Sequence, residues 1–306
     1  MSKALIRIGV IGVGRWGKNH VRALKELERE VDVELKAVCD VREEVAKNVG
    51  KEFGVPIASS SCREILTYID AAIIATSIDT LSRVARMVLE QGKHALIEKP
   101  VATTSKEALE LLEIANRNKV VAMPGMIMRF NDGVNKLKEL LKNSKLVYLS
   151  FRRLSRRPSY MTKYPLLLDL GIHDIDLCRY LTEDDIEEVL TAYRAKVADD
   201  EVVVTVVKTK SGIPCHIHID GVSPYKVREV DVATSEAFIR VDTNTNKLTI
   251  LKPGAEKVIE LEGREPLKQE LLWFIELVKH GSTDYKPNLV DAVKNLIVIE
   301  TIMSRT

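Results

Sequence analysis

The chain has 306 residues, 29% of them charged, and a formal net charge of only +2. This near balance argues against a protein that binds nucleic acid or an acidic membrane through its overall charge. The length suits two domains, no apolar run is long enough to span a membrane, and the first residues show no signal peptide, so we expect a cytoplasmic protein. The four cysteines form no CxxC pair, which predicts buried, reduced thiols rather than a disulfide framework or a zinc site.

The first predicted unit is a strand, a glycine-rich turn and a helix. An apolar run at residues 6–11 is followed by Gly12, Gly14 and Gly17 and then by a helical pattern at residues 18–29. In this order the glycines permit a tight turn, close approach of the backbone to a pyrophosphate, and close packing of the helix on the strand. The helix N-terminus also offers amide groups to the phosphates, so the turn predicts a dinucleotide site.

A second apolar strand, residues 33–39, ends in Asp40, twenty-three residues after Gly17. An acid at this place binds a ribose 2′-hydroxyl and repels a 2′-phosphate. The predicted cofactor is therefore NAD. Arg42 could pair with a 2′-phosphate, which keeps NADP as an alternative.

Up to residue 122 the chain repeats one unit, a strand and then a helix. Continuous apolar strands that alternate with amphipathic helices predict a doubly wound parallel sheet, so we assign residues 1–122 to a Rossmann domain. Further strands are predicted at residues 55–57, 71–75, 95–98 and 120–123, and helices at 42–51, 80–91 and 105–117. Because ligands bind at the carboxyl ends of such strands, the predicted cofactor-binding residues are Gly12, Gly14, Arg15, Trp16, Gly17, Asp40, Arg42, Thr76, Ser77, Glu98 and Lys99.

From residue 123 the pattern changes, and we assign residues 123–306 to a substrate-binding α+β domain. Consecutive strands with short turns predict an open, largely antiparallel sheet. Strands are predicted at residues 146–154, 189–197, 202–209, 214–221, 227–233, 237–241 and 247–251, and helices at 131–141, 170–181, 266–280 and 289–303.

Three segments resemble the hallmarks of the glucose-fructose oxidoreductase and inositol dehydrogenase (Gfo/Idh/MocA) family: the glycine turn through Asn19, Glu98-Lys99-Pro100, and residues 169–176. The resemblance implies a nicotinamide-dependent oxidoreductase of sugars or polyols, a homodimer or homotetramer built through the C-terminal sheet, and no metal. By similarity, Lys99 matches the active-site lysine, and Asp169 and His173 match the aspartate and histidine pair. Residues 16–19 and the arginine-rich segment before Asp169 look most like nucleotide-sugar 3-dehydrogenases that act on UDP-linked N-acetyl sugars.

The chemistry of these side chains agrees with this assignment. Oxidation of a secondary alcohol needs a hydride acceptor and a base that works near neutral pH, as a histidine does. Asp169 lies four residues before His173 on the same predicted helix face, where it can orient the imidazole. Lys99 follows the end of a Rossmann strand and could act as the base or as a polarising charge. The sequence does not decide between Lys99 and His173.

Residues 151–163 carry four arginines and a lysine but no acid. Such a cluster predicts a diphosphate-bearing substrate, with Arg153, Arg157 and Tyr164 as its ligands. A solvated loop or a subunit contact is the alternative, and a free polyol is the alternative substrate. His216, His218 and Asp220 alternate on one strand face, and we interpret them as a polar sheet face rather than a metal site.

The chain departs from the family pattern near the cofactor. Leu81 stands where relatives commonly carry a histidine, and residues 123–126 lack the histidine that many nucleotide-sugar members place there. A redox sensor that binds NAD without turnover and a methyltransferase are the competing classes. A sensor would not need Lys99 and His173, and a methyltransferase would not need Asp40.

Overall fold

The computed structural model describes residues 5–282 and 284–306. Its chain divides into two compact units, each described by itself below. The first comprises the residues up to Gly125 and Leu267–Val293, and the second comprises Met126–Pro266 and Lys294–Thr306. The predicted boundary lay three residues earlier and placed residues 267–293 in the second domain. They belong to the first unit because their side chains bind its elements: the Tyr285 hydroxyl, for example, accepts a hydrogen bond from the Ala122 amide at 2.8 Å.

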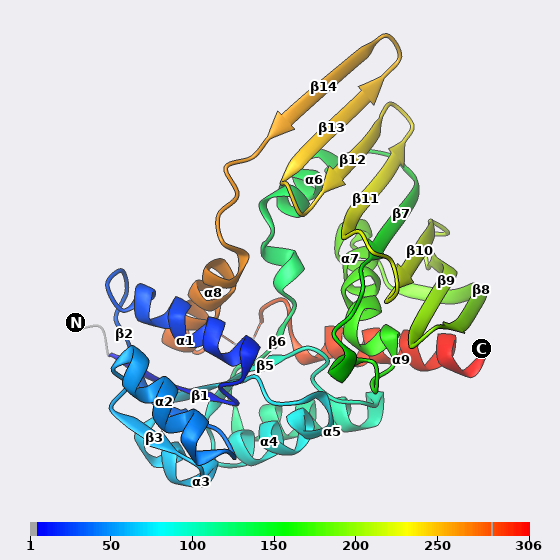
Figure 1. Cartoon of the computed structure of the whole chain (residues 1–306). Coiled ribbons are helices and arrows are strands. Elements are labelled where there is room, and N and C mark those ends of the chain that lie inside the picture. The colour runs from blue at the N-terminus through cyan, green and yellow to red at the C-terminus, as the bar shows by residue number, and fades with distance from the viewer. Residues whose placement is uncertain (1–4, 283) are drawn as a thin grey trace. The chain divides into compact units, whose positions relative to one another are not determined.

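The first unit contains a six-stranded parallel sheet in the order β3-β2-β1-β4-β5-β6, as the sequence predicts for a Rossmann domain. The chain reverses its direction of winding between β1 and β4, and the helices cover both faces, with α1 on one and α4 and α5 on the other (Figure 1). The strands are β1 (Ile6–Ile11), β2 (Val33–Cys39), β3 (Ile57–Ser59), β4 (Ala71–Ile74), β5 (His94–Glu98) and β6 (Ala122–Gly125). The helices are α1 (Arg15–Leu27), α2 (Glu43–Phe53), α3 (Cys62–Ile65), α4 (Ile78–Glu90), α5 (Ser105–Asn118) and, but for its first residue, α8 (Pro266–His280).

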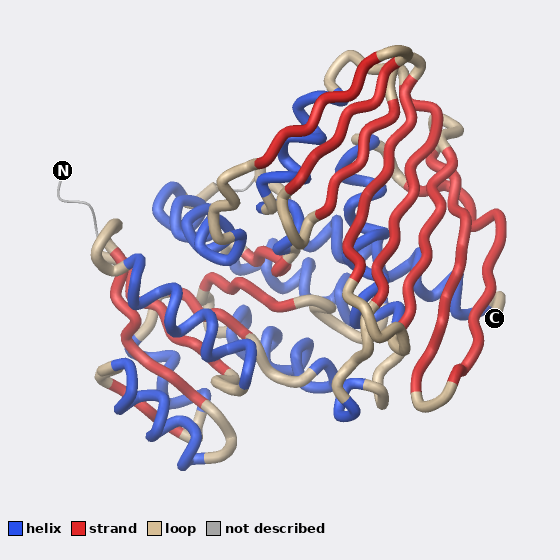
Figure 2. The backbone as a smooth tube through the Cα atoms, turned by 45° about the horizontal axis from the view of Figure 1, so that its top comes forward, coloured by secondary structure: helices blue, strands red, loops and turns tan. Residues whose placement is uncertain are grey.

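The second unit contains an eight-stranded sheet in the order β14-β13-β12-β11-β7-β10-β9-β8. Only β7 and β10 pair in parallel, so the predicted open, largely antiparallel sheet is confirmed (Figure 2). The strands are β7 (Leu146–Leu154), β8 (Ile186–Val197), β9 (Asp200–Thr209), β10 (Pro214–Asp220), β11 (Val227–Thr234), β12 (Phe238–Asp242), β13 (Lys247–Lys252) and β14 (Ala255–Glu260). The helices are α6 (Asp132–Leu141), α7 (Ile172–Thr182) and most of α9 (Leu289–Ser304).

One face of this sheet packs on α6 and α7. The side chains of β7 show the alternation: Leu149, Phe151 and Arg153 are buried, whereas Ser150 and Arg152 are more exposed. An arginine therefore occupies a core position of this strand, which needs a buried partner of opposite charge. Within residues 5–282 and 284–306, no helix is both long and apolar enough to cross a membrane.

Candidate active site

The glycine turn of the first unit has the backbone that its sequence predicts. Gly12 has φ +87°, and a Cβ atom added to Gly17 would lie 1.8 Å from the Gly12 carbonyl oxygen, so neither position accepts a side chain. At Gly14 an added Cβ would meet its nearest neighbour, Arg42 Nη2, only at 3.9 Å, which leaves room for a close ligand. Gly14 also precedes α1 without a side-chain cap, so the first amides of that helix can bind phosphate oxygens.

Asp40 and Thr76 follow the ends of β2 and β4. The Asp40 side chain is buried and accepts hydrogen bonds from Arg42 Nε (3.0 Å) and Nη2 (3.3 Å). The Thr76 hydroxyl is buried and has no hydrogen-bond partner among the described residues. An orphaned hydroxyl, uncapped helix amides and an open glycine turn together fit a dinucleotide. Arg42 is already bound to Asp40, so the two charges are partly neutralised before a ribose arrives.

Glu98, at the end of β5, joins α1 to the strand that precedes Lys99. Its Oε1 accepts hydrogen bonds from Trp16 Nε1 (2.5 Å) and lies 2.7 Å from His20 Nε2, while its Oε2 accepts one from the Lys99 amide (3.3 Å). The carboxylate is buried, as is His20. Glu98, which we predicted as a cofactor ligand, therefore has a structural role as well: it fixes the backbone at Lys99.

Glu270 on α8 is a buried acid that no sequence pattern singles out. Its side chain is fully buried, and neither carboxylate oxygen has a hydrogen-bond partner among the described residues. Burial raises the pKa of Glu270, and the nearby charge of Glu98 raises it further. Burial and the second carboxylate thus both disfavour the charged form of Glu270.

In the second unit, Asp169 and His173 lie on one continuous helical segment. Asp169 belongs to a π-type turn, Leu167–Gly171, that leads directly into α7, and His173 is the second residue of α7. The i, i+4 spacing places both side chains on one side of this segment. Both are buried to 9% exposure or less, and π-type turns often occur at functional sites.

Arg157 is buried beneath this segment and holds it in place. Its Nε donates to Asp200 Oδ2 at 2.8 Å, its Nη2 forms a second bond to Asp200, and its Nη1 donates to the Tyr164 carbonyl oxygen at 3.1 Å. Nη1 also lies 3.5 Å from Asp169 Oδ2. Burial alone would lower the pKa of Arg157, but Asp200 and Asp169 raise it. Arg157 thus connects Asp169 to the loop that bears Tyr164.

Arg153 is the core arginine of β7, and it forms a bidentate ion pair with Asp174 on α7, with Nε 2.9 Å from Oδ2 and Nη2 2.7 Å from Oδ1. Both side chains are buried. Residues 151–163 contain no acid themselves, but Arg153 and Arg157 pair with Asp174 and Asp200 from elsewhere in the chain. Their guanidinium groups are occupied by carboxylates, and this removes the argument for them as diphosphate ligands.

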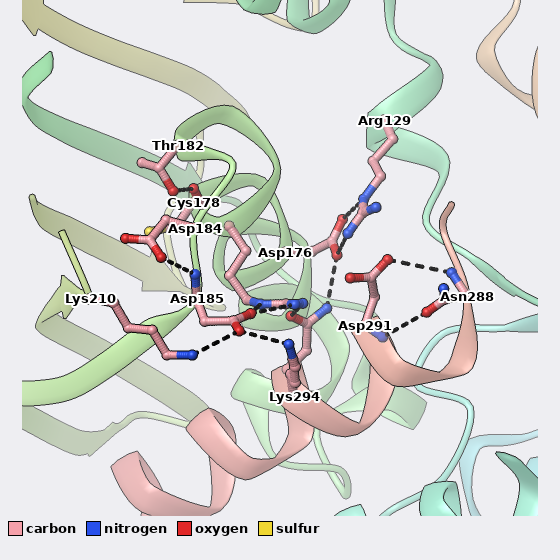
Figure 3. A network of polar contacts seen from close by, with 12 residues as sticks. Arg129, Asp176, Cys178, Thr182, Asp184, Asp185, Lys210, Asn288, Asp291 and Lys294 are labelled. Carbon is pink, nitrogen blue, oxygen red and sulfur yellow. Dashed lines mark hydrogen bonds and ion pairs between the residues drawn. The ribbon is translucent and has the colours of Figure 1, made fainter. Parts of the chain in front are cut away.

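A second buried pair anchors α7 on its other side. Arg129 donates to Asp176 at 2.8 and 2.6 Å, and Asn295 Nδ2 donates to Asp176 Oδ1 at 2.9 Å. Figure 3 shows this ion pair together with a second ion pair of the same polar network, in which Asp185 binds Lys294 at 2.6 Å. The helix that carries His173 is thus bound by ion pairs through both Asp174 and Asp176.

Arg228 on β11 is a cation that the sequence analysis missed. It lies opposite Arg153 in the β11–β7 register. Its guanidinium donates to the carbonyl oxygens of Leu154 (2.9 Å) and Val227 (2.8 Å) and to Ser155 Oγ (2.9 Å), which are all neutral acceptors. Burial, followed by the charge of Arg153, lowers the pKa of Arg228 to about 10, although the charges of Asp174, Asp169 and Asp220 act in the opposite direction, so it stays charged at neutral pH.

The side chains of His216 and Asp220, which alternate along β10, have different hydrogen-bond partners. His216 Nδ1 lies 3.0 Å from Ser150 Oγ on the neighbouring strand, whereas Asp220 accepts hydrogen bonds from the amides of Val222 and Ser223 in the following turn. In the described part of the chain, no group of three histidine, cysteine or acidic side chains is placed to hold a metal ion.

Two family models match the chain. A model of an oxidoreductase family with an NAD-binding Rossmann fold matches residues 6–126, and a model of the GFO/IDH/MocA C-terminal domain matches residues 150–240. The chain therefore belongs to the Gfo/Idh/MocA family of oxidoreductases, and its first unit is an NAD-binding Rossmann domain. It is an enzyme of the dehydrogenase type that acts on sugars or polyols.

Individual relatives differ in substrate. The chain is 29% identical over 223 residues to myo-inositol 2-dehydrogenase of Thermotoga maritima, which covers 68% of this chain and 66% of the relative. It is 27% identical over 284 residues to UDP-N-acetylglucosamine 3-dehydrogenase of Acidithiobacillus ferrooxidans. This match covers 89% of this chain and 88% of the relative. The solved structure of the latter enzyme superposes with a TM-score of 0.91 at 24% identity, over 98% of this chain and 97% of that one. A 3-ketoreductase from Actinomadura kijaniata, in complex with TDP-benzene and NADP, shares the fold at a TM-score of 0.85, with 17% identity over 98% of each chain.

We predict that Arg153→Leu destabilises the protein by about 3 to 5 kcal/mol, because it leaves Asp174 buried and unpaired. Urea unfolding measures this loss. Arg156→Ala, at an exposed position of the same segment, is the matched control and should change the unfolding free energy by less than about 0.5 kcal/mol. The double variant Arg153→Leu/Asp174→Leu should recover much of the loss, and a single-variant cost below about 1 kcal/mol would contradict the buried ion pair.

We also predict a pH-dependent stability from Glu270. Its pKa is raised in the folded state, so its protonated form stabilises the fold below the unfolded-state pKa, and this stability is lost as the pH rises toward the folded-state pKa. Between pH 5 and 8 the unfolding free energy of the unmodified protein should fall relative to Glu270→Gln, by at most about 1.4 kcal/mol per pH unit. Glu276→Gln, at an exposed position of the same helix, should keep the original slope. Parallel pH profiles for Glu270→Gln and the unmodified protein would show that Glu270 is ionised throughout.

Proposed function

We propose that the protein oxidises a secondary alcohol of a UDP-linked sugar, at C3, with NAD as the hydride acceptor. The observation that carries the proposal is the extent of likeness: the match to UDP-N-acetylglucosamine 3-dehydrogenase spans 89% of this chain, whereas the match to myo-inositol 2-dehydrogenase spans 68%. The inositol relative has the slightly higher identity, so a free polyol is the second candidate substrate.

Each half of the proposed site lies within one unit. Bound at the glycine turn, the nicotinamide cofactor would accept the hydride from the carbinol carbon. Lys99 or His173 takes the hydroxyl proton, and the other stabilises the developing charge on oxygen. Asp169 orients His173 and supports its charged form, and Arg157 in turn holds Asp169. Glu98 fixes Lys99 through its backbone amide.

For the diphosphate, Arg228 is a better candidate than Arg153 or Arg157. Its three hydrogen-bond acceptors are neutral, and it lies beside Arg153 in a setting that disfavours its charge. An anion would relieve this penalty, because a charge-assisted pair compensates a partly buried guanidinium. Ser155, which Arg228 contacts, begins the loop that leads to Tyr164.

The first test concerns catalysis. Lys99→Ala and His173→Ala should each lower turnover by about 10²-fold or more, while NAD affinity changes little. Asp169→Asn should cost less, because it keeps the shape and weakens only the support for a charged imidazole. His216→Ala, a histidine on β10 bound to Ser150, is the matched control and should retain near-normal turnover. Near-normal turnover of Lys99→Ala or His173→Ala would remove that residue from the mechanism. NAD binding by the unmodified protein without turnover of any sugar or polyol would favour an NAD-binding sensor.

The second test concerns the substrate. Steady-state kinetics with NAD should give a kcat/KM at least about tenfold higher for a UDP-linked N-acetyl sugar than for the free sugar or for myo-inositol. Arg228→Met should raise KM for the UDP-sugar by roughly ten- to a hundredfold and leave free-sugar kinetics unchanged. Arg240→Met, whose native arginine is half exposed and paired with Asp231, is the control. Equal activity on free and UDP-linked sugar would overturn the proposal and favour a polyol dehydrogenase.

The same assay with NADP in place of NAD tests the predicted contact between Asp40 and the ribose of the cofactor.

A further inference from the structure

Two cysteines far apart in sequence meet beside the dinucleotide turn. Cys39 is the last residue of β2 and is buried, and Cys62 is the first residue of α3 and is partly exposed. Their Sγ atoms are 2.8 Å apart. A disulfide bond has an S–S length of about 2.05 Å, so the two sulfurs need to approach by less than an ångström to be joined.

The two thiols are chemically unequal. A hydrogen bond from Cys39 lowers the pKa of Cys62, and the positive charge of Arg83 on α4 acts in the same direction against burial. The same hydrogen bond raises the pKa of Cys39, and burial raises it further. Cys62 is therefore the less buried of the two thiols and has more thiolate character, and Cys39 is in contact with it. This is the arrangement of an attacking and a resolving cysteine.

We propose that Cys39 and Cys62 form a reversible dithiol–disulfide site whose oxidant is a small-molecule disulfide. The Cys62 thiolate attacks one sulfur of the oxidant RSSR, forms a mixed disulfide and releases RS⁻, which takes up a proton. Cys39 then loses its proton and attacks Sγ of Cys62, which forms the Cys39–Cys62 bond and releases the second RS⁻. In sum, two protein thiols and RSSR give one protein disulfide and two RSH, and two electrons pass from the protein to the oxidant.

The position of the pair defines what the bond would do. The Cys39 carbonyl oxygen accepts a hydrogen bond from the Gly12 amide at 2.7 Å, and the next residue is Asp40. Asp40 in turn donates its amide to Ser59 at the end of β3, three residues before Cys62. A Cys39–Cys62 bond would tie α3 to the end of β2, which leads into Asp40 and is hydrogen-bonded to the glycine turn after β1. Because the sulfurs move so little, we expect stabilisation of this strand end and an almost unchanged NAD affinity.

The second unit contains another pair of cysteines with which the Cys39–Cys62 pair can be compared. Cys178 and Cys215 are also in contact with one another, but both are fully buried. Thiol reagents in water reach only exposed sulfur, so this pair should stay reduced under native conditions. If only Cys39 and Cys62 react, exposure and thiolate character determine the reactivity, and the proximity of two sulfurs alone does not.

The test uses the full chain, reduced and then incubated under native conditions with oxidised glutathione. After quenching and unfolding, thiols are counted by maleimide labelling and the linkage is mapped by peptide mass spectrometry. We expect loss of two thiols, a Cys39–Cys62 peptide, a thermal midpoint raised by at least about 3 °C, and an NAD affinity within about twofold of the reduced protein. Dithiothreitol should reverse all of these changes.

Two variants sharpen the result. Cys62→Ser should lose no thiols and show no shift of its thermal midpoint, whereas Cys215→Ser should still lose two. The linkage map of the unmodified protein decides the question even if a variant folds poorly. Glutathione that stays on Cys62, a Cys178–Cys215 bond as the only product, or four thiols that remain unreacted would each overturn the proposal. A change in NAD affinity above about fivefold would contradict the expected small movement of the strand end.

Discussion

The buried ion pair between Arg153 and Asp174 is the interaction on which the position of the proposed catalytic histidine depends. Arg153 occupies a core position of β7, and Asp174 follows His173 directly on α7. Two charges removed from water must satisfy each other with good geometry, which leaves the helix few positions relative to the sheet. A second pair, Arg129 with Asp176, limits rotation of the same helix. Apolar packing alone would tolerate small shifts of α7 that a bidentate ion pair does not.

The first unit uses one carboxylate in a comparable way. Glu98 gathers Trp16, His20 and the Lys99 amide at the end of β5, so the start of α1 and the backbone of the proposed catalytic lysine share one acceptor. The same carboxylate acts on Glu270, because its charge adds to burial in raising the pKa of that acid. Fixed charges close to reacting groups lower the reorganisation needed during a reaction, and both units therefore present preorganised groups.

Local sequence patterns predicted the fold because strands, turns and helices depend largely on residues that are close together in the sequence. The glycine turn, the alternation of apolar strands with helices in the first unit and the run of short strands in the second are all confirmed. Strand β14 was missed because its residues are mostly exposed, half of them are charged, and they show no apolar alternation. Residues 267–293 were assigned to the wrong unit because a helical pattern does not reveal what its apolar face contacts.

The site was predictable only where its residues belong to a motif. Lys99, Asp169 and His173 lie in such motifs, and their roles stay predictions. The ion pairs of Arg153 and Arg157 were not predictable because their carboxylate partners, Asp174 and Asp200, are 21 and 43 residues away in sequence. Glu270 and Arg228 gave no signal because an acid in a core position and a cation without an acidic partner are recognised only from burial and contacts. The Cys39–Cys62 contact joins residues 23 positions apart and was likewise invisible without a CxxC spacing.

In this chain, the groups that maintain the fold differ from those that we expect to select the substrate. The chain shares 24% identity with the solved UDP-N-acetylglucosamine 3-dehydrogenase, yet the two structures superpose with a TM-score of 0.91. Within this chain, glycines without room for a side chain and buried charges with fixed partners constrain the backbone. A guanidinium that already binds a buried carboxylate is less free to bind a variable ligand. We therefore expect substrate selection to rest on polar groups whose bonds within the chain are replaceable, and Arg228, which donates to the neutral oxygens of Leu154, Val227 and Ser155, meets that condition better than Arg153 or Arg157.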